Sequence, residues 1–142
     1  MLTLENKTRR ALSRLINQPL WLQAYLAVLP PDYELSLVLI NNKKARELNL
    51  TYRGQDYAAN VLSFPLGKKV GEIFLNLDQT GHELLFLFIH GLLHLKGMTH
   101  GSTMEREEQK ILNVLNGKTT NHRARHRHRL GTDRRVRIGS RQ

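Results

Sequence analysis

Apolar residues recur along the chain in patterns that predict strands separated by helices. Leu2 and Leu4 alternate with polar residues, which is typical of a short strand at a sheet edge. Residues 33–40 are apolar on both faces towards their end, which indicates an interior strand. Residues 61–64, followed by a proline, and residues 72–77 are also typical of strands. We therefore expect a sheet of four strands.

Apolar residues at helical spacing cover most of the intervening chain. The stretch from about 7 to 29 predicts two helices, because Pro19 interrupts the pattern and suits the start of a helix. Further helices are expected over 43–52, behind an asparagine cap, and over 102–115, with one apolar stripe. The helix that starts near residue 81 is apolar nearly all round, so we expect it to be buried at the centre.

Length and composition narrow the class of protein. A chain of 142 residues, 40% of them hydrophobic, suits one domain with a hydrophobic core. Its sequence has no apolar stretch long enough to cross a membrane, and its first residues do not resemble a signal peptide. Cysteine is absent, which excludes disulfides and thiolate ligands and fits the reducing cytoplasm. We expect a cytoplasmic protein in which only His, Asp or Glu could hold a metal.

The positive charge of the chain is concentrated at its C-terminal end. Of the net charge of +10, residues 118–142 contribute +8, from nine Lys or Arg and one acid, and residues 1–117 contribute +2. The basic end has no apolar periodicity, so we expect a domain at 1–117 and a disordered tail at 118–142. Such a tail is attracted to polyanions through the release of counterions, without sequence preference.

Candidate chemistry lies at the end of the expected central helix. His90 and His94 are four residues apart, so they project from one helical face. Gly97 suits the end of the helix, after which the chain can turn His100 back towards the other two. Three converging imidazoles predict a zinc site whose fourth position is open, as in catalytic zinc sites. The alternative is that each is an ordinary core or surface histidine with a satisfied hydrogen bond. Several unpaired imidazoles on a buried helix would be unfavourable, and a metal would offset that cost.

These histidines belong to a longer pattern that resembles the YbeY family, the bacterial and organellar endoribonucleases of ribosomal RNA maturation. Residues 90–100 resemble its signature His-Gly-Leu-Leu-His-Leu-x-Gly-x-x-His. Upstream, residues 48–54, 60–65 and 71–75 resemble its Leu-Asn-x-x-Tyr-Arg, Thr-Asp-Val-Leu-Ser-Phe-Pro and Gly-Asp-Ile segments. The blocks occur in the family's order and cover about residues 1–116, so together they are more specific than any single motif.

The resemblance implies an α+β fold, in which one small mixed four-stranded sheet packs with about five helices and a zincin-like central helix carries the metal histidines. It implies a zinc ion on His90, His94 and His100. It also implies a single-strand-specific, metal-dependent endoribonuclease of small-subunit rRNA processing and ribosome quality control. Its partners would be single-stranded RNA, ribosomal RNA and the small ribosomal subunit.

The retained arginine of the family falls on Arg53, so the resemblance implies a catalytic or phosphate-binding role there. A guanidinium suits this role, because it pairs with phosphate oxygens and stays charged. Without the resemblance, an arginine at the end of a helix is more often a solvated charge. Glu83 lies on the same helical face as His90, and we expect it to cap the helix rather than to orient a ligand.

Three positions depart from the family pattern. Asn60 stands where the family usually has Asp, Ala59 where it has Thr, and Thr99 where it often has Asp. Because Asn60 cannot act as a base, a non-catalytic RNA-binding assembly factor with a structural metal stays open.

A second alternative is a zinc metallopeptidase, because metzincins have the same histidine spacing. Gly91 argues against it, since those proteases carry their glutamate base at this position.

Zinc would lower the pKa of a water molecule towards about 7. The sequence does not choose between attack on RNA by that water and attack by a ribose 2′-hydroxyl.

Overall fold

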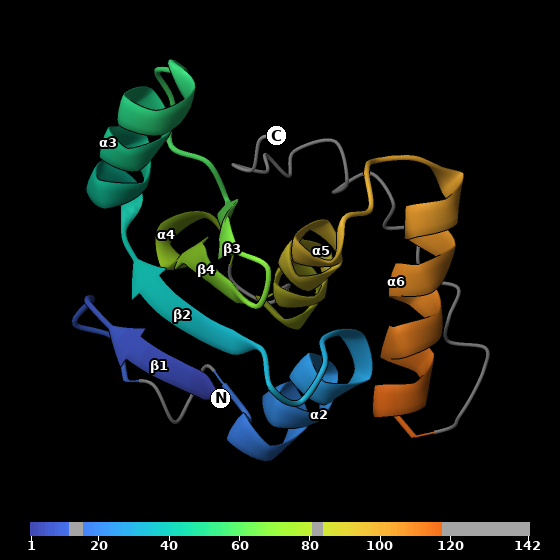
Figure 1. Ribbon diagram of the computed structural model, residues 1–142. Coiled ribbons are helices and arrows are strands. Elements are labelled where there is room, and N and C mark those ends of the chain that lie inside the picture. The colour runs from blue at the N-terminus through green and yellow to red at the C-terminus, as the bar shows by residue number, and fades with distance from the viewer. Residues whose placement is uncertain (12–15, 81–83, 118–142) are drawn as a thin grey trace.

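A computed structural model describes residues 1–11, 16–80 and 84–117 (Figure 1). Its elements, in chain order, are β1 (Leu2–Asn6), α2 (Gln18–Val28), β2 (Glu34–Ile40), α3 (Asn42–Arg53), β3 (Val61–Gly67), β4 (Val70–Asn76), α4 (Leu77–Thr80), α5 (Leu84–Lys96) and α6 (Ser102–Leu115). The expected α+β class is confirmed, with a mixed sheet of four strands. The basic tail and Glu83 lie outside the described residues. In the described part of the chain, none of the helices has the length and apolarity needed to cross a membrane.

The sheet has the strand order β1-β2-β4-β3. β1 pairs in parallel with β2, β2 pairs in parallel with β4, and β3 pairs antiparallel with β4. The expected edge position of the first strand and interior position of β2 are therefore confirmed. An interior strand with helices on both faces needs apolar residues on both sides, which is why β2 ends in consecutive apolar residues.

The third strand is longer than its sequence suggested. We expected it to end before Pro65, but β3 continues through Pro65 to Gly67, with a register shift between the two. Proline lacks a backbone N–H and is tolerated only where the ladder does not need that donor. Within the described residues β3 pairs only with β4, so it is an edge strand and has one side without a ladder.

Two local elements also differ from the expectation. A short helix, α4, follows β4, where the pattern suggested that the strand reached Leu77. Residues 7–11 are not helical, and residues 12–15, which belong to the helix expected before Pro19, lie outside the described ranges. The helix expected to start near Pro19 is confirmed as α2, with Asn17 as its N-cap.

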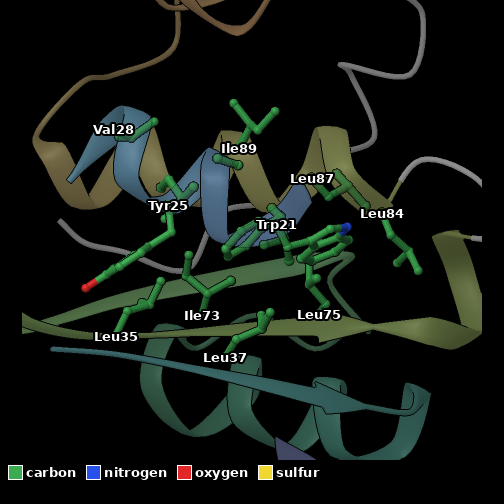
Figure 2. Close-up of a cluster of buried hydrophobic side chains, with 14 of the residues drawn as sticks. Trp21, Tyr25, Val28, Leu35, Leu37, Ile73, Leu75, Leu84, Leu87 and Ile89 are labelled. Carbon is green, nitrogen blue, oxygen red and sulfur yellow. The ribbon is translucent and has the colours of Figure 1, made fainter. Parts of the chain in front are cut away.

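Helices cover both faces of the sheet. In Figure 2, side chains of α2 and α5 point towards Leu35, Leu37, Ile73 and Leu75 on one face, and α3 lies on the other face. Trp21 of α2 stacks on a phenylalanine of α5 with ring centroids 4.6 Å apart. The smaller cluster on the α3 side contains Val38, Ile40 and Ala45. This division confirms the two faces expected for the strand at 33–40.

Helix α5 is the buried central helix that its composition predicted. It lies between the sheet and α6 (Figure 1), and its residues from Leu87 to Leu93 are all buried. Gly91 permits this close approach, because a Cβ there would lie 2.9 Å from Ser63 Oγ and 3.1 Å from Ile73 Cδ1. The Ser63 hydroxyl donates a hydrogen bond to the Gly91 carbonyl at 3.2 Å. The sheet thus fixes the helix that carries the first two histidines.

Candidate metal centre

The C-terminal end of α5 turns the chain back towards the helix. Gly97 has a φ of 109°, a region that other residues adopt only with strain. Its N–H donates to the His94 carbonyl at 3.0 Å, and the Met98 N–H donates to the Leu93 carbonyl at 3.0 Å. Both bonds belong to the glycine-based motif that satisfies the last carbonyls of a helix. The expected helix end at Gly97 is confirmed, and it places His100 beside the helix.

The structure brings the three predicted histidines together. The ring centroids of His90 and His94 are 4.9 Å apart, those of His90 and His100 are 5.0 Å apart, and those of His94 and His100 are 4.9 Å apart. Each ring offers one nitrogen, and these nitrogens all lie within 4.8 Å of one another. Three donor atoms this close together could hold one metal ion.

The three rings differ in exposure. His90 is buried, with 1% of its surface exposed, whereas His94 is intermediate and His100 is exposed. The cluster therefore reaches from the protein interior to the surface. Solvent or a substrate can approach it from the side of His100.

The chemistry of the donors fits a metal ion. The pKa of His94 is lowered to about 3, mainly by burial and also by the charges of His90, His100 and Arg53. His94 is therefore neutral at physiological pH, which is the form that binds metals. Its Nε2 atom is buried and has no hydrogen-bond partner among the residues that the structure describes. An unpaired buried imidazole nitrogen is unfavourable, and a metal would satisfy it.

A fourth residue of the site, Glu108, was not anticipated from the sequence. It lies on α6 with 3% of its surface exposed, and its Oε2 is in close contact with Nδ1 of His90. The pKa of the Glu108 carboxyl is raised to about 8, mainly by burial and also by the charge of Glu105, against the opposing charge of His100. The sequence did hold a signal, because Glu108 falls within the buried stripe that Met104 and Ile111 form on α6. A carboxyl group on the apolar face of a helix needs a partner.

Arg53 also lies near the histidines. It ends α3, where Gly54 has a φ of 69° and caps the helix. Asn49, which is fully buried, donates from Nδ2 to the Tyr57 carbonyl at 3.0 Å and so holds the loop that follows. The Arg53 side chain is close enough for its charge to lower the pKa of His94. The structure thus brings Arg53 towards the cluster from a different part of the chain.

The positions that depart from the family pattern supply no donor to the cluster. The group that could hold a metal consists of the histidines alone within the described ranges. Asn60 and Ala59 contribute backbone carbonyls, which accept hydrogen bonds from the backbone and side-chain nitrogens of Asn76 at 2.9 and 3.1 Å. Thr99 is exposed.

The position where metzincins carry their glutamate faces the sheet. A Cβ on Gly91 would already be within contact distance of Ser63 and Ile73. A glutamate side chain could therefore enter only if α5 moved away from the sheet. This packing explains why a glycine occupies position 91. The site therefore lacks the glutamate that acts as the base in those proteases.

Fold and site together define a class of small α+β proteins in which a histidine cluster at the end of a central helix could hold a metal ion. The family model described as "Endoribonuclease YbeY" matches residues 3–122. The chain therefore belongs to the YbeY endoribonuclease family.

Individual relatives agree with this assignment. An endoribonuclease YbeY of Helicobacter pylori (strain 26695) is 38% identical over an alignment of 125 residues, and the match covers 78% of this chain and 86% of that protein. One of Alkaliphilus metalliredigens is 35% identical over an alignment of 102 residues, and the match covers 56% of this chain and 66% of that protein. A Thermotoga maritima protein with a known solution structure is 28% identical, with a TM-score of 0.58 over 82% of this chain and 90% of that one.

Proposed function

We propose that this protein is a zinc-dependent endoribonuclease that cleaves single-stranded RNA. The observation that carries the proposal is the triangle of imidazoles, 4.9 to 5.0 Å apart, in a member of a family of endoribonucleases. We further propose that residues 1–117 form the catalytic domain. The biological substrate would be ribosomal RNA of the small subunit, during its maturation and quality control.

In this proposal His90, His94 and His100 hold the zinc ion. Zinc prefers neutral imidazole nitrogens in tetrahedral arrangement, and the lowered pKa of His94 keeps that ring neutral. Three protein ligands are typical of catalytic zinc, whereas structural zinc has four. A bound zinc ion supplies Lewis acidity, which polarises a phosphoryl oxygen and lowers the pKa of a water molecule.

Arg53 would bind the phosphate at the cleaved bond. Its guanidinium can donate two parallel hydrogen bonds to phosphate oxygens and stays positively charged at any cellular pH. The charge of Arg53 lowers the pKa of His94, so Arg53 is near enough to act electrostatically on a phosphate bound at the cluster. Positive charge at this position stabilises the negative charge that builds up on the phosphoryl oxygens during cleavage.

The product ends distinguish two routes of cleavage. Attack by the ribose 2′-hydroxyl leaves a 2′,3′-cyclic phosphate, whereas attack by water leaves a monophosphate directly. Asn60 cannot accept a proton as a carboxylate would, so neither route uses that position as a base.

The basic tail at 118–142 would strengthen the binding of RNA. Its net charge of +8 attracts a polyanion through counterion release. This contribution is independent of sequence, so it would tether RNA or ribosome without selecting the bond that is cut.

One experiment tests the assignment of the site. The zinc content of the purified protein and its cleavage of a single-stranded RNA are measured for wild type, His90→Ala, His100→Ala and Arg53→Ala. We expect about one zinc per chain in wild type and Arg53→Ala, and little in either histidine variant. We expect cleavage to be lost in both histidine variants and weakened in Arg53→Ala.

Because His90 is buried and His100 is exposed, the His100 variant keeps the test valid if His90→Ala does not fold. Undiminished RNA cleavage by a zinc-free His100→Ala protein would contradict the proposal. Peptide cleavage without RNA cleavage would favour the metallopeptidase. Zinc binding without any cleavage would favour the assembly factor.

A further inference from the structure

We propose that Glu108 is a positioning residue of the metal centre, which holds Nδ1 of His90 so that Nε2 is the nitrogen that binds the metal. The inference rests on the proposed metal site and extends it to α6. It is carried by the close contact between Glu108 Oε2 and His90 Nδ1.

Glu108 is unusual in its burial. It is the one acidic side chain in the described ranges that is buried, with 3% of its surface exposed, and its partner His90 is 1% exposed. Glutamate is rarely buried unless it is paired, because water solvates a carboxylate much better than the protein interior does. The contact with His90 provides that pairing.

The requirements of folding do not explain a carboxylate at this position. Glu108 lies between Met104 and Ile111 on the buried face of α6, where an apolar residue would pack without losing solvation. Replacing a buried polar pair by apolar residues is often neutral or stabilising for a protein. The position therefore points to a role for the carboxylate beyond the packing of α6 on α5.

The contact with Nδ1 determines how His90 can act. In a neutral imidazole one nitrogen carries the proton and the other is an acceptor, and the hydrogen bond of one nitrogen sets the role of the other. The positive charge of a bound zinc ion would favour the ionised form of Glu108 over the neutral form that burial favours, and a carboxylate at Nδ1 keeps the proton there and leaves Nε2 with the lone pair that a metal needs. Such partners also orient the ring of a metal-binding histidine and increase its basicity.

The same contact connects both sides of the turn that carries His100. His90 lies on α5, and α6 begins at Ser102, two residues after His100. By joining the middle of α6 to His90, Glu108 ties α6 to α5. We infer that this contact helps to maintain the 5.0 Å separation between the rings of His90 and His100.

The test compares zinc binding with stability for Glu108→Gln, Glu108→Leu and the control Glu107→Gln. Glu107 is the preceding residue on α6, and its side chain is 35% exposed and 3.7 Å from Lys110. Zinc affinity is measured for the full chain by competition with a chromophoric chelator at constant pH. Thermal unfolding of the metal-free protein is measured in parallel, and NMR of its imidazole nitrogens at alkaline pH, where Glu108 is ionised, identifies the tautomer of His90.

We expect Glu108→Gln and Glu108→Leu to bind zinc about 10- to 100-fold more weakly than wild type, as for other groups that support a metal ligand. Metal-free Glu108→Leu should lose some thermal stability, because Nδ1 of His90 is left buried without this partner, but zinc affinity should fall by more than that loss of stability accounts for. In Glu108→Leu, His90 should lose its preference for the proton on Nδ1. Glu107→Gln should match wild type in all three measurements.

Wild-type zinc affinity in Glu108→Leu would overturn the inference, and so would an unchanged tautomer of His90. A loss of affinity in proportion to a loss of stability would overturn it too, because Glu108 would then act only through folding. Failure of the wild-type protein to bind zinc would instead overturn the proposed metal site itself, so the two failures are distinguishable.

Discussion

The candidate metal centre has a buried side and an exposed side, formed by different kinds of residue. On the buried side, His90 and Glu108 have 1% and 3% of their surface exposed and contact each other directly. On the other side, His100 is exposed and Arg53 is partly exposed at the end of α3. Protein atoms fix the buried pair, whereas the exposed side chains can reach a ligand from solution. The difference suggests that holding a metal and handling a substrate are separable, and single substitutions can test this.

The largest effect is expected for His94, which lies between the two sides. His94→Ala removes one of the three nitrogens of the cluster, so we expect zinc to be lost and RNA cleavage to fall by more than about 100-fold, beyond the loss typical of a supporting residue. Zinc analysis and single-turnover cleavage provide the measurement. A circular dichroism spectrum like that of wild type would show that the loss is not due to unfolding. Retention of both zinc and cleavage would remove His94 from the site.

The second largest effect is expected for Arg53 on the exposed side. Arg53→Ala should reduce cleavage by about 100-fold, the effect typical of removing one group that stabilises charge in a transition state, and should leave zinc content unchanged. Arg46→Ala is the matched control. Arg46 lies on the same helix but pairs with Asp56 at 2.6 Å, with both side chains largely exposed.

Arg46→Ala should cleave RNA like wild type. Equal losses in the two arginine variants would indicate a general effect of charge on α3 instead of a role for Arg53. Arg53→Lys should recover only part of the activity, because lysine lacks the planar pair of donors.

A smaller effect is expected where α5 packs on the sheet. Gly91→Ala should lower the free energy of unfolding by about 1 kcal/mol, because an overpacking cost of about 1–3 kcal/mol exceeds the gain of about 1 kcal/mol from higher helix propensity. Urea unfolding of the metal-free protein measures this change.

Ser63→Ala provides the companion variant for a double-mutant cycle. It removes the Oγ atom that would lie 2.9 Å from the new Cβ. The loss of unfolding free energy in the double variant should therefore be smaller than the sum of the losses in the two single variants. Strict additivity of the two losses would show that Ser63 does not cause the strain.

The smallest effect is expected from the tail, which is remote in sequence from the cluster. Replacing Arg123, Arg125, Arg127 and Arg129 by glutamine in the full chain should weaken RNA binding at low salt and make its salt dependence shallower. Zinc content and the cleavage rate at saturating RNA should not change. An unaltered salt dependence of RNA affinity would contradict a tethering role for these arginines.

Much of the fold was predictable because it depends on local patterns. Alternating apolar residues placed the strands, and the helices expected at 43–52 and 102–115 were found at Asn42–Arg53 and Ser102–Leu115. Periodicity reveals such elements because each one must bury a face, and backbone geometry fixes which residues share that face. The end of β3 was missed, because the effect of Pro65 depends on whether a neighbouring strand needs its missing donor.

The candidate site was predictable only in part, because only some of its residues lie close together in the sequence. His90, His94, Gly97 and His100 lie within eleven residues, so helical geometry and one glycine turn were enough to predict that the rings converge. Glu108 lies 18 residues from His90 on another helix, and its contact follows from the packing of α6 on α5.

The sequence by itself determined the strands, the buried central helix and the convergence of its histidines, because these follow from the backbone geometry of single segments. Only the tertiary structure decided which side of the site is buried and which is exposed. It also decided that Glu108 contacts His90 and that Arg53 approaches His94. These relations join segments far apart in the chain, and they depend on how whole elements pack, which no local pattern specifies.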